Sequence, residues 1–253
     1  MGLYHEKEDL SMPIALNLAM TGAEMTGKTT LPDHTAWMAC HFSPSGQGLS
    51  NLPKWLPPGS VLILDDSTPI DGHDPALIAE QLKTCIDSLQ CGGVLLDFQR
   101  PGEEQARRLA QYLCRAFPLP VAVSDIYADG LDCPVFVSPI SPDEAMTTRL
   151  SRWHGREIWL DTTMEGLEIV LTEKGARSAP LPPSERPEGG LAEKRLHCHY
   201  RVSLGADQAV FKLWRTADDI SAQLAEAERL GVTAAVGLYQ EFRPLPGVEG
   251  GVD

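Results

Sequence analysis

Short apolar runs alternate with helical patterns along most of this chain, and this alternation constrains its fold more than any other sequence feature. Most of the runs are continuous and rich in β-branched residues, as in parallel strands that are covered on both faces. Strands that alternate with helices are typical of a parallel α/β fold. The sequence predicts eight such strands: Ile14–Met20, Thr35–Phe42, Val61–Leu64, Gly93–Phe98, Val121–Ser124, Val135–Val137, Glu157–Leu160 and Thr233–Leu238.

Three helices between these strands have clear sequence signals. The dipeptide at positions 74–75, Asp-Pro, supplies an N-cap and a proline for the first helical turn. A 3.6-residue apolar period predicts a second helix from about Glu103 to Phe117. Thr216 and Asp219 resemble a capping box at the start of a third helix. A weaker helical pattern covers Pro142–Trp153.

The number of predicted strands fits a known architecture. Eight strands in roughly 230 residues are typical of a compact (β/α)₈ TIM barrel. Residues 21–34 are rich in Gly, Thr and Pro without a helical pattern, so the N-terminal part is irregular. Hairpin patterns at Leu167–Leu181 and Leu196–Trp214 break the alternation later. We therefore predict one TIM-barrel domain over residues 1–253, with a small antiparallel insertion at 164–214, before the last helix and strand.

The charge of the chain excludes some classes of partner. Lys plus Arg number 21 and Asp plus Glu number 35, which gives a formal net charge of −14. A protein that binds nucleic acid regardless of sequence needs a basic face, so we expect no nucleic-acid partner. The same charge opposes binding to anionic membranes, and no apolar run approaches the ~18–20 residues of a membrane span.

The cysteines and the first residues bear on the cellular compartment. Cysteines number 6 and form no C-x-x-C pair, which favours reduced thiols over a disulfide framework. Residues 1–13 have neither the basic nor the apolar region of a signal peptide. We therefore expect a cytoplasmic location.

One segment matches a nucleotide-binding motif in its letters. Gly22, Gly27, Lys28 and Thr29 fit the pattern G-x-x-x-x-G-K-[ST]. A phosphate site also needs a helix that begins at the lysine. Pro32 follows closely and no helical pattern comes after it. A glycine-containing loop is therefore the favoured interpretation, and we expect no cofactor.

Two histidines at alternate positions form a second pattern with metal-binding potential. His197 and His199 would share one face of a strand. The spacing offers no third ligand, and Arg195 and Arg201 would share that face and repel a cation. We therefore favour a solvated hairpin face and predict no metal site.

The most informative segment is C-G-G-V-L-L-D-F-Q-R-P, at residues 91–101. Leu95, Asp97 and Gln99 alternate, so they share one face of the predicted strand. In a barrel this face points into the interior, and the strand end lies at the C-terminal mouth, where the active sites of such barrels are found. Asp97 and Gln99 are therefore candidate site residues.

This segment resembles the fourth-strand signature D-G-x-D-x-D-x-E of family 18 glycoside hydrolases, the chitinase-like enzymes. Asp97 takes the place of the third Asp of the signature, and Gln99 takes the place of its Glu. Residues 210–224 and 230–235 are similar to the family's insertion strand, seventh helix and last strand. The resemblance covers residues 60–243 in outline and implies a TIM barrel with glycoside-hydrolase ancestry.

The departures from the family pattern bear on activity. In the family, the Glu donates a proton to the leaving glycosidic oxygen, and the preceding Asp orients the substrate's N-acetyl group, which attacks as an internal nucleophile. Gln99 has no titratable proton. Leu95 replaces the second Asp of the signature, and Gly237 or Leu238 stands where the family has a tryptophan that floors the sugar site.

Other acidic residues follow predicted strands, and in a barrel they would gather at the same mouth. The simpler alternative is that they belong to the polar strand ends of any α/β fold. The catalytic candidates are Asp97, Gln99, Asp65 and Glu241, and the ligand-binding candidates are Asp66, Asp125, Asp161 and Tyr239.

Three functions are open at this point. A catalytically impaired relative of the family would bind an oligosaccharide or other glycan-like ligand at the mouth. An active glycosidase would use a relocated acid, namely Asp65, Asp66 or Glu241. A structural or interaction protein would need no ligand. We favour the first, because Gln99 stands on an otherwise family-like strand.

Overall fold

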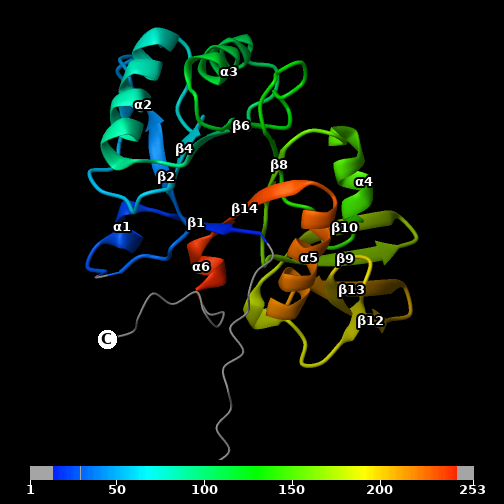
Figure 1. Ribbon diagram of the computed structural model, residues 1–253. Helices are drawn as coiled ribbons and strands as arrows, with labels where there is room; N and C mark the ends of the chain where they lie inside the picture. Colours follow the sequence, from blue (N-terminus) through cyan, green and yellow to red (C-terminus); the bar gives the residue numbers. More distant parts are fainter. Residues whose placement is uncertain (1–13, 29, 244–253) are drawn as a thin grey trace, which may run out of the picture.

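The computed structural model describes residues 14–28 and 30–243, and within them eight parallel strands close into a barrel. Their order is β1-β14-β8-β7-β6-β5-β4-β2, and β1 pairs with β2 to close the sheet (Figure 1). The predicted TIM barrel is thereby confirmed. The barrel strands are β1 (Leu16–Met20), β2 (Thr35–Phe42), β4 (Val61–Asp65), β5 (Gly93–Asp97), β6 (Val121–Ser124), β7 (Val135–Val137), β8 (Ile158–Asp161) and β14 (Val232–Leu238).

Apolar side chains on both faces of the strands explain why the sheet closes. Ile63, Leu95 and Trp159 point inward and fill the barrel with other buried side chains. Their neighbours Leu64 and Leu96 belong to a larger apolar layer between the strands and the helices. Successive strand residues face opposite sides, so a strand that is buried on both sides has the continuous apolar run seen in the sequence.

Helices cover the outside of the barrel (Figure 1). The Asp74 side chain caps α2 by accepting a hydrogen bond from the N–H of Ala76 at 3.0 Å. Thr216 and Asp219 form the predicted capping box of α5. In the described part of the chain, no helix is both long enough and apolar enough to cross a membrane. The helices are α1 (Gly22–Met25), α2 (Pro75–Leu89), α3 (Glu104–Ala116), α4 (Met146–Leu150), α5 (Ala217–Arg229) and α6 (Tyr239–Phe242), with 3₁₀ turns η1 (Ser151–Trp153) and η2 (Pro183–Glu185).

The first connection of the barrel is irregular, as the sequence predicts. Between β1 and β2 the chain forms only the short helix α1, which Thr21 caps. Among the described residues no helix begins at Lys28, and Thr29 lies outside the described residues. The motif match therefore lacks the helix N-terminus that a phosphate site needs. Lys28 instead donates a hydrogen bond to the hydroxyl of Tyr239 at 2.8 Å.

A second, antiparallel sheet lies between β8 and α5 in the chain, and Figure 1 shows it beside α5. His199 Nδ1 contacts Asp219 of α5 at 2.8 Å, and His197 contacts Glu226 of the same helix. His197 lies in a turn before the strand that begins at Cys198, so the two histidines do not share a strand face. Both attach this sheet to α5, rather than lying on the solvated face that we predicted. The sheet has the order β10 (Gly175–Leu181), β9 (Gly166–Thr172), β13 (Gln208–Trp214), β12 (Cys198–Leu204) and β11 (Leu191–Glu193), and β3 (Leu49–Ser50) pairs with β2.

The packing inside the barrel gives a testable prediction at Gly93. A Cβ at this position would lie 2.8 Å from Cη2 of Trp159, which is only 5% exposed. We predict that Gly93→Ala lowers the free energy of unfolding by about 1–3 kcal/mol, as in other overpacked cores, measured by urea denaturation. The control is Gly205→Ala, whose Cβ would meet its nearest atom at 3.5 Å. Equal losses in the two variants would contradict this account.

Candidate functional site

The ends of three neighbouring strands place polar side chains in one row at the barrel mouth. His41 of β2 is in register with Asp65 of β4, and Asp65 is in register with Asp97 of β5. A β-bulge in β2, between Trp37 and Cys40, shifts the alternation just before His41. Bulges re-aim side chains in this way. No pattern in the sequence indicated His41, because a bulge leaves no local signal of the face to which the next side chain points.

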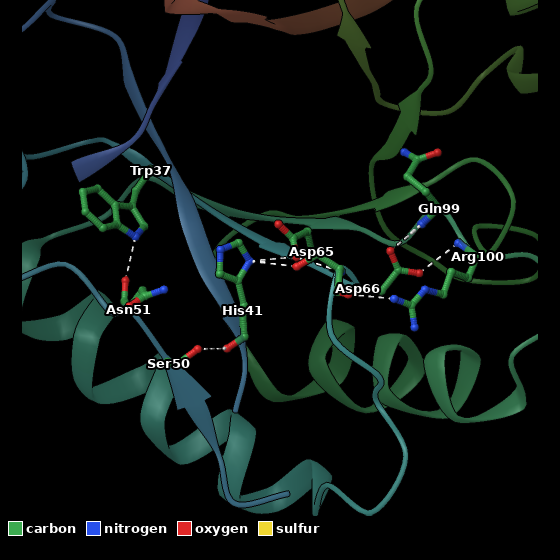
Figure 2. A network of polar contacts seen from close by, with 9 residues as sticks. Trp37, His41, Ser50, Asn51, Asp65, Asp66, Gln99 and Arg100 are labelled. Atoms are coloured by element: carbon green, nitrogen blue, oxygen red, sulfur yellow. Dashed lines mark hydrogen bonds and ion pairs between the residues drawn. The ribbon is translucent and has the colours of Figure 1, made fainter. Parts of the chain in front are cut away.

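Asp65 is the centre of a polar network at this row (Figure 2). Its Oδ1 atom contacts His41 Nδ1 at 2.8 Å and accepts a hydrogen bond from the N–H of Ser67 at 2.9 Å. The hydroxyl of Ser67 also contacts His41 Nδ1, at 3.2 Å. Asp65 is therefore held in place by a basic side chain and by its own turn.

Asp66 has a different position and role from those predicted for a ligand contact. It is 4% exposed, and its two oxygens accept hydrogen bonds from the N–H groups of Gln99, at 3.1 Å, and Arg100, at 2.8 Å (Figure 2). Asp66 does not line the cavity at the mouth. Its two bonds fix the backbone that follows β5, so it positions Gln99.

A cavity of about 280 Å³ opens at the mouth. This volume is near the lower end of the ~300–1,000 Å³ that is usual for small-molecule sites. Ile63, Leu95 and Phe136 form an apolar part of its wall. The side chains of five acidic residues, from β4, β5, the end of β8 with its following loop, and α6, form an acidic part: Asp65, Asp97, Asp161, Glu165 and Glu241.

The side chains of Asp97 and Gln99 are in contact, but β5 ends at Asp97, so Gln99 lies beyond the strand. The side-chain amide of Gln99 donates a hydrogen bond to Asp97 Oδ1. Burial raises the pKa of Asp97, the hydrogen bond from Gln99 lowers it, and the charges of Asp65 and Asp66 raise it again. Asp97 lines the cavity, whereas Gln99 is exposed beside it.

Asp161, the last residue of β8, is the most perturbed carboxyl group among those that line the cavity. Burial, together with the smaller effects of the charges of Asp97 and Glu241, raises its pKa to about 8. A carboxyl group with this pKa holds its proton at neutral pH, which is the protonation state of a hydrogen-bond donor or a general acid.

Glu241 also lines the cavity, but its carboxylate already has partners. Its Oε2 atom accepts hydrogen bonds from the hydroxyl of Thr163 at 2.8 Å and from the N–H of Met164 at 2.7 Å. Glu241 thus ties α6 to the segment after β8. Glu165 in the same segment lines the cavity as well, and no sequence pattern indicated it, because it follows the strand in an irregular loop.

Two of the predicted ligand-binding residues do not line the cavity. Asp125 is 6% exposed and pairs with Arg149 at 2.8 Å. Tyr239 is 8% exposed and accepts the hydrogen bond from Lys28. Both residues follow strand ends, as expected. Their polar atoms contact other side chains, however, and do not face the cavity.

The raised pKa of Asp161 predicts how stability depends on pH. Between its ordinary value of 3.8 and about 8, the folded state holds this proton and the unfolded state does not, so this group makes stability fall as pH rises, by at most about 1.4 kcal/mol per pH unit. We predict that Asp161→Asn flattens this fall and stabilises the protein at about pH 8, measured by denaturation across the pH range. Asp207→Asn, at an exposed turn, should leave the slope unchanged; a flattened slope there would contradict the assignment.

Comparisons with known proteins show which solved structures have a similar fold. No family model matches the chain, and no curated protein matches its sequence. The Bacillus cereus spore cortex-lytic enzyme SleL is similar in structure, with a TM-score of 0.56, 9% identity and coverage of 88% of this chain and 70% of SleL. A chitinase from Chromobacterium violaceum has a TM-score of 0.53 and 9% identity, covering 88% and 93%.

A third solved structure is similar to the same extent. It is provisionally named the sporulation-specific glycosylase ydhD of Bacillus subtilis, with a TM-score of 0.54, 8% identity and coverage of 79% of this chain and 88% of that one. At such identities the likeness concerns the fold alone. This chain therefore has a glycoside-hydrolase-like TIM barrel, with a cavity rich in carboxyl groups at its mouth.

Proposed function

We propose that this protein is a relative of family 18 glycoside hydrolases that binds a carbohydrate or glycan-like ligand at the barrel mouth and has lost the family's hydrolytic chemistry. The observation that carries this proposal is the hydrogen bond from the Gln99 amide to Asp97, beside the cavity. The pair stands where the family signature has its Asp and its Glu. An amide can hold Asp97 in place but cannot supply a proton.

The neighbourhood of this pair also departs from an active site of the family. Loss of general acid catalysis alone costs roughly 10²–10⁴-fold in rate. Leu95, which replaces the second Asp of the signature, is 1% exposed inside the barrel and gives Asp97 no polar support. Leu238, rather than a tryptophan, lines the cavity from the last strand.

The lining of the cavity supports a sugar-like ligand. Apolar side chains on one part of the wall can contact the C–H face of a ring, and carboxyl groups on the other part can bind its hydroxyls. A lining that combines apolar side chains with polar groups is usual for a small-molecule site. The small volume suits one residue of a glycan rather than a long chain.

A second candidate is an active glycosidase with a relocated acid, and one observation favours it. Asp161 lines the cavity and has a pKa of about 8, so it holds a proton at neutral pH. The acids considered from the sequence are engaged elsewhere. Asp65 contacts His41, and Asp66 accepts hydrogen bonds from the backbone of the next loop. Glu241 accepts hydrogen bonds from Thr163 and Met164. A relocated acid would therefore be Asp161.

Ligand binding is tested by thermal unfolding with oligomers of glucose, N-acetylglucosamine and glucosamine. We predict that at least one of them raises Tm, because a ligand that binds only the native state stabilises it, by ~2.7 kcal/mol at a hundred times Kd. Asp97→Ala should remove the shift, and Asp207→Ala should keep it. If no oligomer changes Tm, the protein is the structural or interaction protein of the third alternative.

Catalytic impairment is tested by hydrolysis of N-acetylglucosamine oligomers and aryl glycosides. We predict no hydrolysis by the wild type, and rescue no greater than just above background by Gln99→Glu, because Leu95 and the missing tryptophan remain. Robust hydrolysis by the wild type would refute the impaired assignment. If wild-type hydrolysis survived in Asp97→Asn and disappeared in Asp161→Asn, the active glycosidase with Asp161 as its acid would replace the impaired relative as the assignment.

A further inference from the structure

The cavity at the mouth has an unbalanced charge. It is lined by five acidic side chains, Asp65, Asp97, Asp161, Glu165 and Glu241. Within the described part of the chain, no Lys, Arg or His lines it. A neutral ligand would leave this imbalance as it is and an anionic ligand would increase it, whereas a cationic ligand would relieve it.

The basic groups nearby compensate only part of the charge. His41 pairs with Asp65 at 2.8 Å, the single ion pair that any of the five acids forms among the described residues. The guanidinium of Arg186 donates to the backbone oxygen of Met164, and the charge of Glu241 acts on it from nearby. Asp97, Asp161 and Glu165 are left without a basic partner within the described residues.

Asp97 and Asp161 are partly buried at strand ends, and their surroundings disfavour the ionised form of each. Burial raises the pKa of Asp97 and raises that of Asp161 to about 8, and the negative charge of Asp97 contributes to the second shift. A cation between them would favour the ionised form of both groups. The pair therefore has more to gain from a positive charge than from any other ligand group.

The rest of the lining indicates an organic cation rather than a metal ion. Thr162 lines the cavity, is 2% exposed, and its hydroxyl has no hydrogen-bond partner in the described part of the chain. Ile63, Leu95, Phe136 and Val236 supply an apolar part of the lining. An ammonium group on a ring brings hydrogen-bond donors for the polar side and C–H surface for the apolar side.

We propose that this mouth selects glycans that carry a free, protonated amine, of the glucosamine type, over their N-acetylated or anionic counterparts. The ammonium group lies between Asp97 and Asp161, and the ring lies against the apolar wall. N-acetylation removes the positive charge and adds bulk to a cavity of about 280 Å³. This inference rests on the proposed function, because it names the substrate class of the same site.

The experiment compares glucosamine and N-acetylglucosamine oligomers of equal length by isothermal titration calorimetry, at about pH 6.5 and physiological salt. We expect the amine form to bind the wild type at least about tenfold more tightly. Asp161→Asn and Asp97→Asn should each bring the ratio of the two affinities towards one. Circular dichroism of each variant establishes that it is folded.

The controls separate this site from non-specific attraction, since the chain has a net charge of −14. Asp207→Asn and Glu173→Gln make the same change of a carboxyl group to an amide at exposed hairpin turns of the second sheet and should keep the wild-type ratio. An equal fall of the ratio in these controls would overturn the inference.

Two further outcomes distinguish this inference from the proposed function. Equal or tighter binding of the N-acetylated form would overturn the amine selectivity and leave glycan binding at the mouth in place. Absence of binding by either form, together with the absence of any effect of the glucose oligomers on Tm, would overturn both.

Discussion

Closure of the parallel sheet is the constraint on which the rest of this structure depends. Once β1 pairs with both β14 and β2, every strand end of the same polarity points to one opening. The apolar interior below is filled by side chains such as Trp159 and Leu95. A polar side chain that points inward at a strand end therefore faces this opening, and Asp65, Asp97 and Asp161 line the cavity there.

Such a gathering of like charges is unfavourable for folding, and the chain compensates for it selectively. Asp65 contacts His41, and Asp66 accepts hydrogen bonds from two backbone N–H groups, so both carboxyl groups have polar partners nearby. Asp161 has no comparable partner in the described residues and holds a proton instead, with a pKa of about 8. Carboxyl groups with perturbed pKa values that cluster at one opening are typical of functional sites. At such sites the arrangement needed for binding or chemistry lowers stability.

Local signals in the sequence predict the barrel well, because its strands and helix starts depend on nearby residues. A run such as Val61–Leu64 is apolar on both faces, and Asp74 caps its helix through a neighbour two residues away. The site depends instead on partners that are distant in sequence. Neither the bulge that aligns His41 with Asp65 nor the two bonds from Asp66 to the loop after β5 leaves a local pattern. The same holds for the environment that sets Asp161 apart from the other acids.

The hydrogen bonds between Asp66 and the loop after β5 affect how this site can change in evolution. Because Asp66 binds the N–H groups of Gln99 and Arg100, the backbone at position 99 is anchored without any help from the side chain that it carries. A substitution at this position alters the chemistry at the mouth while the loop keeps its path. A carboxyl group can therefore be gained or lost at position 99 in one mutational step without a change in the path of the loop.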